Sequence, residues 1–458
     1  MESVTLAIAV SASALIFFLS PVYGLIVFVA AMVWYPSYMT VPIGTIDFTV
    51  CRIIILAVFA NLYVRTDLRR RFRLIGLDKV IVVYFFCEIL AGMFISRSIL
   101  DFLVNRAGAV FDMVLPYFAV RMIIKNKQQY FTLLKGILIV AAPLAIIGLY
   151  QCLTGNNPFG FLEQYNKWKL DMLHQPLARN GFYRADVTFS VSIMYGLFFA
   201  MLGPVCAGVL YSTKKHKMLC WICLGLMGIG IFSSMSSGPW LAGLLSILFI
   251  VFYYWRKYWK PALIIIILLC GFVELISNRH FYDVIGDFTL NPATAWYRSR
   301  LISVTFFEGG MSGHWLLGFG YAVDPGWGPI IDERNHTDVV NHFIFILVSY
   351  GLVGLIPFLV ICVMVVKKLI NAYKISLSDS DKWLVWCLSA GLFGLAGAMS
   401  SVSLFGPPMS LLYILIAFCG AMPVIVRQRK VSPYIVVTDE ASQKRSEILT
   451  HNVQELRH

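Results

Sequence analysis

The chain has 458 residues, of which 59% are apolar and only 13% are charged. Soluble domains average about 45–50% apolar and about 25% charged residues, so the composition excludes an ordinary soluble protein and indicates a polytopic membrane protein. The net charge of +13 lies mostly in short loops beside apolar runs, which is the positive-inside pattern, and we therefore expect no nucleic-acid partner.

Apolar runs that are long enough to cross a bilayer follow one another along the chain and predict 12 to 13 transmembrane helices. They cover residues 4–20, 22–35, 48–64, 80–95, 109–124, 130–153, 187–211, 219–232, 240–255, 262–277, 342–366, 384–402 and 411–426. Pro21 separates the first two runs, which form either two short spans or one long bent element.

Basic residues mark one side of the membrane. They follow the runs that end near residues 64, 124, 211, 255, 366 and 426, and the densest group lies at 65–73. All these loops fall on one face if successive runs cross the membrane, so we place them in the cytoplasm. The N-terminal hairpin is the uncertain part of this topology.

The expected organisation is an all-α polytopic fold with one large, partly helical periplasmic loop. Residues 1–153 are N-terminal transmembrane helices, 154–186 a first outer-face loop, 187–278 central helices, 279–340 the large loop, 341–426 C-terminal helices and 427–458 a cytoplasmic tail. The 279–340 segment is rich in aromatic residues, Gly and Pro, which indicates a folded segment. Long loops in compact chains are usually functional, so chemistry is expected there.

Arginines occur on the two outer loops against the topology bias: Arg179, Arg184, Arg279, Arg298, Arg300 and Arg334. A guanidinium group binds phosphate through two parallel hydrogen bonds and keeps its charge when it is partly desolvated. The alternative is that these side chains snorkel or pair with nearby Asp and Glu. We expect at least one of Arg184, Arg298 and Arg300 to bind an anionic substrate.

His336 and His342 lie where the large loop meets the next apolar run, beside Asp338 and Asn341. If the helix begins near Asp338, then Asp338 and His342 lie one turn apart, and a carboxylate behind a histidine suits a general base. The alternative is a structural histidine at a helix start. Two histidines six positions apart with one carboxylate are not a specific metal pattern, and no metal is expected.

Ionisable residues inside the predicted spans are candidate functional groups, because charge in a bilayer is costly. These are Arg52, Glu88, Asp112 and Glu274. A structural ion pair with an arginine such as Arg106 is the simpler explanation for Asp112.

Four stretches together resemble the O-antigen ligase and O-antigen polymerase superfamily of bacterial envelope glycosyltransferases, and more narrowly its exopolysaccharide-type members. They are an Arg-Ala segment leading into a span (181–204), a Ser-rich hairpin with a Trp-bearing helix (233–245), an arginine-bearing segment with Gly-x-Gly (294–321), and a span with Gly-x-x-Gly (338–355). In the register set by Gly351 and Gly354, Val340 and Asn341 stand where ligases have His-Asn, and the histidine follows as His342.

The resemblance implies a GT-C-like inverting glycosyltransferase at the outer face of the bacterial inner membrane, without a cofactor. Its donor would be an undecaprenyl-pyrophosphate-linked oligosaccharide, and its other partners a glycan acceptor, membrane lipids and other polysaccharide assembly proteins. The reaction would be polymerisation or ligation of glycan repeats in exopolysaccharide or O-antigen biosynthesis.

The resemblance also implies roles for particular residues. Arg184 with Arg298 or Arg300 would stabilise the departing pyrophosphate. His342, or else His336, would orient or deprotonate the acceptor, with Asp338 behind it. Further candidates for substrate binding are Arg179, Asn341, Trp296 and Tyr297, and the aromatic pair would either stack on sugars or belong to an interfacial belt.

Two other classes of function remain open. One is a transporter or flippase for a lipid-linked or anionic substrate, which would need discontinuous helices and a midplane site around Glu88, Asp112 or Arg106. The other is a noncatalytic membrane scaffold, which would leave the outer loops without a pocket.

Overall fold

Apolar helices make up most of the structure, which is a computed structural model. It describes residues 1–44, 46–65, 67, 70, 72–96, 98–166, 178–212, 217–276, 280, 292–332 and 335–427. Strands are confined, within these ranges, to two short antiparallel hairpins. The mostly helical membrane architecture predicted by the composition is thereby confirmed.

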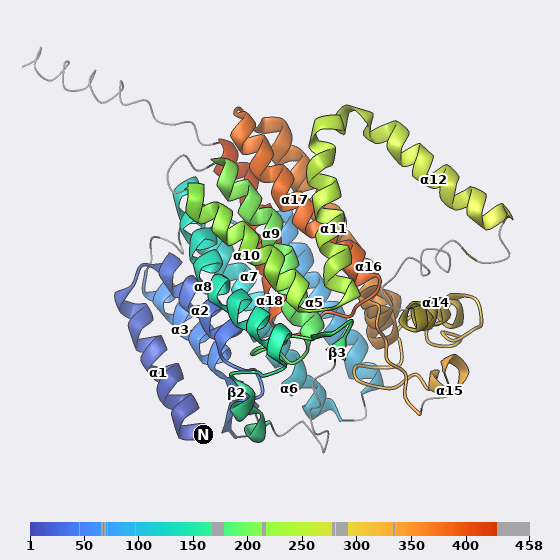
Figure 1. Cartoon of the computed structure of the whole chain (residues 1–458). Helices are drawn as coiled ribbons and strands as arrows, with labels where there is room; N and C mark the ends of the chain where they lie inside the picture. Colours follow the sequence, from blue (N-terminus) through green and yellow to red (C-terminus); the bar gives the residue numbers. More distant parts are fainter. Residues whose placement is uncertain are drawn as a thin grey trace, which may run out of the picture. The chain divides into compact units, whose positions relative to one another are not determined.

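The N-terminal part contains seven named helices, a π-helical turn and one hairpin (Figure 1). They are α1 (Glu2–Phe18), α2 (Pro21–Trp34), β1 (Thr40–Ile43), β2 (Ile46–Thr49), α3 (Val50–Val64), α5 (Gly76–Ile95), α6 (Ile99–Ala109), the π turn Val110–Val114, α7 (Leu115–Ile123) and α8 (Lys127–Thr154). Pro21 starts α2, where its missing N–H costs nothing, so the first two runs form two helices.

The rest of the described chain adds the central and C-terminal helices. They are a 3-10 turn (Gly160–Tyr165), β3 (Ala178–Arg179), β4 (Phe182–Tyr183), α9 (Ser192–Ser212), α10 (Lys217–Ser233), α11 (Ser237–Val251), a 3-10 turn (Phe252–Tyr258), α12 (Trp259–Ile276), α14 (Pro292–Phe306), α15 (Gly328–Ile331), α16 (His342–Ile375), α17 (Asp379–Met399) and α18 (Pro407–Arg427). The predicted tail from residue 428, Arg279 and Arg334 lie outside the described residues.

Six helical segments of the described chain are long and apolar enough to cross a membrane. These are α8, α9, the continuous segment Ser237–Ile276, α16, α17 and α18, and four shorter apolar helices (α1, α2, α3 and α10) accompany them. The total of 12 to 13 spans and the orientation in the inner membrane stay predictions.

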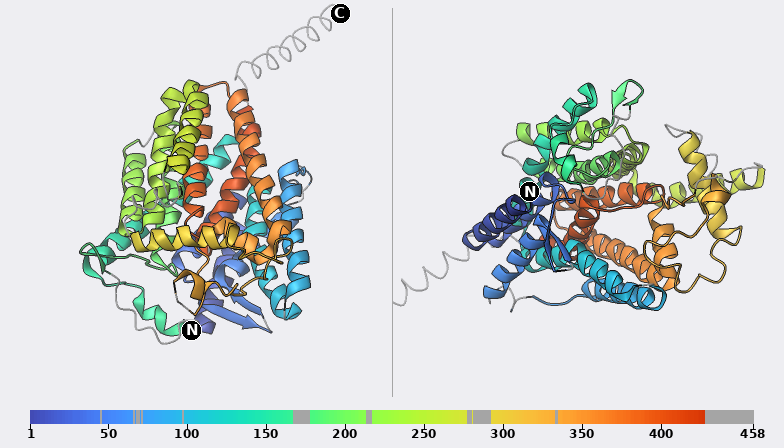
Figure 2. Two further views of the ribbon diagram at one scale, coloured as in Figure 1. Left: turned by 90° about the vertical axis from the view of Figure 1, so that its right-hand side faces the viewer. Right: turned by 90° about the horizontal axis from the view of Figure 1, so that it is seen from below.

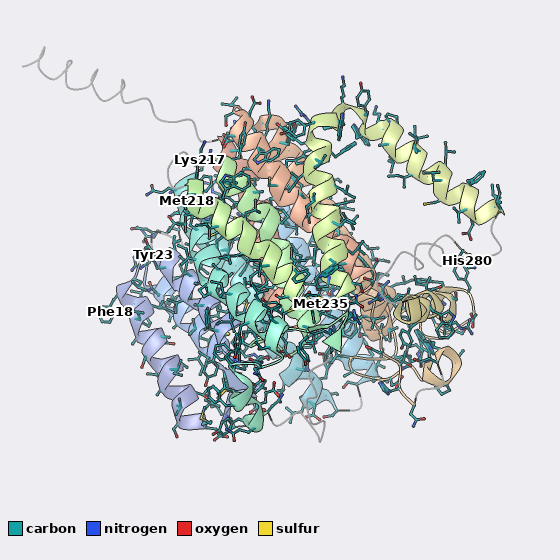
Figure 3. The ribbon with its side chains drawn as sticks, viewed as in Figure 1. Phe18, Tyr23, Lys217, Met218, Met235 and His280 are labelled. Atoms are coloured by element: carbon teal, nitrogen blue, oxygen red, sulfur yellow. The ribbon has the colours of Figure 1, made fainter. Side chains whose placement is uncertain are left out.

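Large apolar side chains project from the surface of the helices. Phe18 is 87% exposed and Met218 is 77% exposed, and both are seen in Figure 3. Side chains of this kind in such numbers suit contact with lipid and not with water. Helix α12 has no buried residue along its whole length, whereas α9 and α18 are buried almost throughout.

Neighbouring helices approach closely where small residues meet. Helix α9 packs against α10, α11 and α17, and α16 packs against α5. At the contact of α11 with α17, a methyl group on Gly394 would lie 2.3 Å from the Ala242 carbonyl oxygen. Membrane helices use such small residues to bring their backbones together.

One end of the 1–426 unit carries most of the non-helical chain, and we refer to it as the loop end. It comprises both hairpins, residues 154–166, α14, α15 and residues 400–406. Figure 1 shows β2, β3, α14 and α15 toward the lower part of the view, and Figure 3, in the same view, labels Lys217 toward the top; Figure 2 gives two further views. The topology argument predicts that the loop end is the outer face.

Helix α16 is interrupted by the loop that precedes it. Gly351 has φ +61°, and the segment 315–319 lies against this break. Hydrogen bonds join them: the Phe319 N–H donates to the Val348 oxygen (2.7 Å), and the Leu352 N–H donates to the Trp315 oxygen (2.8 Å). The loop thus satisfies backbone groups that a break in a membrane helix would leave unpaired.

Candidate functional site

Three of the predicted arginines come together at the loop end, and we call them the arginine cluster: Arg179, Arg184 and Arg298. Arg179 on β3 donates from Nη1 to the Met235 carbonyl oxygen (3.2 Å). Arg184, just after β4, donates from Nη2 to Ser236 Oγ (2.8 Å). The buried Nε of Arg184 has no hydrogen-bond partner within the described chain.

Arg298, on α14, lies close enough to Arg179 for their charges to interact, and Arg179 likewise interacts with Arg184. Burial and then the charge of Arg179 lower the pKa of Arg184, while Asp186 opposes the shift. Burial and then the charge of Arg179 likewise lower the pKa of Arg298, while Asp338 opposes it. The guanidinium groups remain charged at neutral pH. Partly buried cations that repel one another make a favourable position for an anion.

Arg300 and the two aromatic candidates, Trp296 and Tyr297, are not part of the arginine cluster. Arg300 forms an ion pair with Glu308 at a partly exposed position on α14. Trp296 is 55% exposed. Tyr297 is buried, and its hydroxyl accepts from the Asp338 N–H (2.8 Å) and donates to the Asp338 carbonyl oxygen (3.0 Å). Tyr297 therefore holds the chain before α16 against α14, and Trp296 is the aromatic residue left at the surface.

The expected helical pairing of Asp338 with His342 does not form. Helix α16 begins at His342, so Asp338 precedes it in irregular chain, where the Val340 N–H donates to the Asp338 carbonyl oxygen (2.9 Å). Asn341 is the N-cap: its Oδ1 accepts from the N–H groups of Phe343 (3.0 Å) and Ile344 (3.2 Å). Its Nδ2 donates to the Ser400 oxygen (2.7 Å). Asp338 and His342 do not lie one helical turn apart because Asn341, and not Asp338, caps and starts the helix.

His342 is buried, and its Nδ1 accepts a hydrogen bond from the Leu404 N–H (3.3 Å). The neutral ring consequently carries its proton on Nε2. In this state His342 can orient an acceptor hydroxyl by donating to it, whereas Nε2 is not free to take a proton. His336 is exposed and lies near Asp324.

His342 lines a cavity of about 650 Å³ at the loop end, which we call the polar cavity. Its walls come from α2, β2, α3, α5, α6, the π turn, α16 and the start of α18. The charged groups on its walls are Arg52 and Arg106, together with Asp47, Glu88, Asp101 and Asp112. In the described ranges no group of three or more His, Cys, Asp or Glu side chains is placed to hold a metal.

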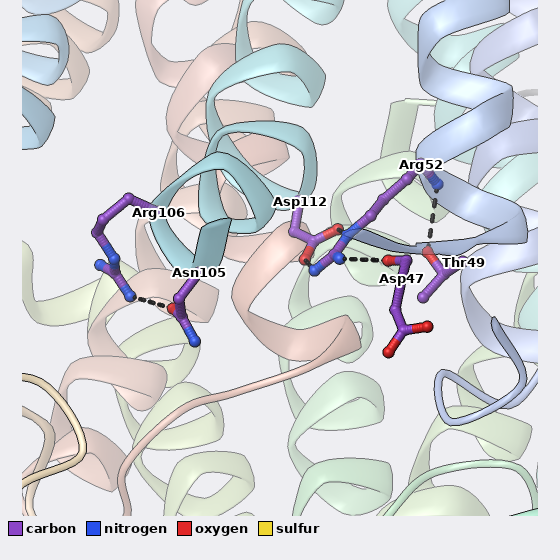
Figure 4. Close-up of polar contacts among 6 residues, drawn as sticks. All are labelled: Asp47, Thr49, Arg52, Asn105, Arg106 and Asp112. Carbon is purple, nitrogen blue, oxygen red and sulfur yellow. Dashed lines mark hydrogen bonds and ion pairs between the residues drawn. The ribbon is translucent and has the colours of Figure 1, made fainter. Parts of the chain in front are cut away.

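Arg52 and Asp112 form a two-pronged ion pair on one wall (Figure 4). Arg52 Nη2 lies 2.7 Å from Oδ2 and Nε lies 3.2 Å from Oδ1, while Nη1 donates to the Asp47 carbonyl oxygen (3.0 Å). The π turn presents Asp112, and such turns are frequent at functional sites. The absence of a side chain at Gly108 leaves space for the Arg52 guanidinium group, since a methyl group there would lie 2.7 Å from Arg52 Nη2.

Arg106 and Glu88 form a second, more buried pair, with less than a tenth of either side chain exposed. Arg106 Nη1 donates to Glu88 (3.2 Å) and Nη2 to Asn105 Oδ1 (2.9 Å). Its guanidinium carbon lies 4.3 Å from the ring centre of Tyr321 and 5.4 Å from that of Tyr350. The buried Arg106 Nε has no hydrogen-bond partner among the described residues. The expected ion pair of Asp112 with an arginine therefore forms, but its partner is Arg52 and not Arg106.

The predicted residues do not all meet in one cavity. The arginine cluster and the polar cavity are two separate features of the loop end, and none of the three cluster arginines lines the cavity. The chain joins them: Asp338 lies near Arg298, and His342, four positions later, is on the cavity wall. Sequence reasoning missed the Tyr321 and Tyr350 contacts of Arg106. The sequence signal that could have indicated these contacts is Arg106 itself, an arginine in a mostly apolar stretch.

Neither protein-family models nor curated proteins give a match to this chain.

Proposed function

We propose that the protein transfers glycan repeats from an undecaprenyl-pyrophosphate carrier to an acceptor hydroxyl, as an exopolysaccharide or O-antigen polymerase or ligase acting at the outer face of the inner membrane. The observation that carries the proposal is the arginine cluster. Two segments of the chain, the β3–β4 hairpin with Arg184 and helix α14, bring guanidinium groups together at the end where the topology bias disfavours them. A pyrophosphate bound beside apolar helices is the anion that suits this place.

The proposed reaction needs stabilisation of a departing anion more than it needs a strong base. The acceptor oxygen bonds to the anomeric carbon, and the bond from that carbon to the pyrophosphate oxygen breaks. The electron pair stays on the phosphate, where fixed cations stabilise it in a partly dry site. The acceptor proton passes to the departing pyrophosphate or to water. His342, with its proton on Nε2, orients the acceptor hydroxyl on the neighbouring wall.

A flippase or transporter is the second candidate, and specific features favour it. The π turn Val110–Val114 and the break at Gly351 are helix discontinuities, and Glu88 with Arg106 is a buried ion pair. Against it, the walls of the polar cavity belong to the loop end and to helix segments nearest to it.

The test is complementation of a gene deletion in the host at matched membrane expression. We expect Arg184→Gln and Arg298→Gln to reproduce the deletion phenotype. Arg300→Gln is the matched control, because Arg300 on α14 pairs with Glu308 just beyond the end of that helix, and it should restore wild-type polymer.

The glycan species that accumulates separates the functions. Single lipid-linked repeats at the outer face indicate a polymerase, and full-length polymer on the carrier indicates a ligase. Repeats held at the cytoplasmic face indicate a flippase and refute the transferase. Normal polymer from the deletion strain would refute both.

A further inference from the structure

The polar cavity carries more negative than positive charge. Two arginines face four carboxylates across its walls, and each arginine is already paired, Arg52 with Asp112 and Arg106 with Glu88. Asp47 and Asp101 add two further carboxylates without a matching cation on the lining. Like charges repel strongly where burial lowers the effective dielectric constant. The cavity therefore disfavours a pyrophosphate, which the arginine cluster favours.

The same walls are rich in groups that recognise a sugar. Carboxylates accept hydrogen bonds from hydroxyls or from ammonium groups. Five tyrosines belong to the lining (Tyr35, Tyr84, Tyr321, Tyr350 and Tyr413), and of these Tyr35 and Tyr321 remain partly exposed. The Arg106 side chain is 8% exposed, lines the cavity and keeps one donor, Nε, without a hydrogen-bond partner among the described residues. An unpaired buried donor is costly, and a ligand oxygen would satisfy it.

The size of the cavity agrees with a short oligosaccharide. Its volume of about 650 Å³ lies inside the range of about 300–1,000 Å³ that is usual for ligand pockets. His342 at the start of α16 lies on its wall, and Asp338, four positions before His342, lies near Arg298 of the cluster. A glycan in the cavity and a phosphate at the cluster would thus lie on the two sides of the same helix start.

We propose that the polar cavity is the acceptor-glycan subsite and takes a neutral or amino-bearing oligosaccharide, while the phosphate of the donor binds only at the arginine cluster. This assignment rests on the proposed transferase function. It separates the two substrates by charge, since the cavity repels the group that the cluster attracts.

The test measures binding by calorimetry with the purified full chain in lipid nanodiscs. The probes are the neutral tetramer of N-acetylglucosamine, the basic tetramer of glucosamine, the acidic tetramer of galacturonic acid and inorganic pyrophosphate. Ser190→Trp places a bulky ring at an exposed position on the cavity lining. Ser312→Trp is the control, an equally exposed serine of the loop end that does not line the cavity.

We expect the neutral or the basic tetramer to bind wild type and Ser312→Trp alike, at least tenfold more tightly than the acidic tetramer, and to lose at least tenfold in Ser190→Trp. Pyrophosphate should bind Ser190→Trp as it binds wild type and lose affinity in Arg184→Gln. Three results would overturn the assignment: no tetramer binds wild type, the acidic tetramer binds best, or Ser190→Trp weakens pyrophosphate.

The binding experiment and the complementation experiment can refute the subsite assignment and the proposed function independently. If the deletion strain makes normal polymer, the transferase is refuted whatever the cavity binds. If complementation supports the transferase and any of the three overturning binding results is obtained, only the subsite assignment is lost.

Discussion

At the scale of single residues, the two ion pairs of the polar cavity differ in how much water reaches them. Arg106 and Glu88 are less than a tenth exposed, whereas 21% of Arg52 and 37% of Asp112 remain exposed. Removing one partner of a buried pair strands the other charge, which costs about 3–5 kcal/mol, while exposed pairs contribute about 0–1 kcal/mol.

We therefore expect Glu88→Ala to destabilise the protein far more than Asp112→Ala. Arg106 would be left without its carboxylate in a dry pocket, but water would solvate Arg52. Thermal unfolding of both variants in the same detergent measures the difference. Equal losses, or a larger loss for Asp112→Ala, would show that the burial difference does not govern these pairs.

Asn341 gives a second residue-scale prediction. Its side chain caps α16, so Asn341→Ala should cost about 1 kcal/mol of folding stability. Asn341→Ser, which can accept the same backbone hydrogen bonds, should recover most of the loss. Polymer production should follow stability in the two variants. A serine variant that is stable and yet inactive would instead give Asn341 a role in substrate binding.

At the scale of elements, hydropathy predicts that helices occur and, for a few of them, where they begin, but not where they break. The start of α16 at His342 and of α2 at Pro21 agree with the apolar runs. The break at Gly351 depends on the segment 315–319, which approaches it in space. The position of Asp338 depends likewise on the Tyr297 hydroxyl of α14. Single-sequence patterns carry no information about these distant partners.

The Gly351 break can be tested directly. A methyl group there would lie 2.2 Å from the Leu316 carbonyl oxygen, and φ +61° disfavours any other residue. We expect Gly351→Ala to detach the segment 315–319 and to make it sensitive to limited proteolysis. The control is Gly225→Ala on α10, where a methyl group meets nothing within 4 Å. Protection of the loop in Gly351→Ala would contradict the close packing.

At the scale of the whole molecule, the charge pattern along the chain predicts the orientation of the loop end. A membrane-impermeant maleimide is added to cells whose outer membrane has been permeabilised. We expect it to label Ser37→Cys and Ser312→Cys. It should not label Leu377→Cys, an exposed position between α16 and α17 at the other end. The reverse pattern would place the arginine cluster in the cytoplasm and remove the basis of the proposed function.

The sequence predicts the membrane class and most helices, because both follow from local hydropathy. The conflict with the topology bias also marks six arginines, of which Arg179, Arg184 and Arg298 form the cluster, but it does not distinguish these three from Arg300. The sequence does not predict that Arg52 pairs with Asp112 or that His342 lines a cavity apart from the cluster. Those relations arise from packing between helices that lie far apart in the chain.

The docked segment in α16 also sets an order of biosynthesis. Residues 315–319 emerge from the ribosome before residues 348–353, to which they hydrogen-bond. In the lipid interior, the backbone groups left open at Gly351 would cost several kcal/mol unless residues 315–319 are already in place to pair with them. On the predicted topology, this segment therefore has to cross the membrane before α16 reaches its final position.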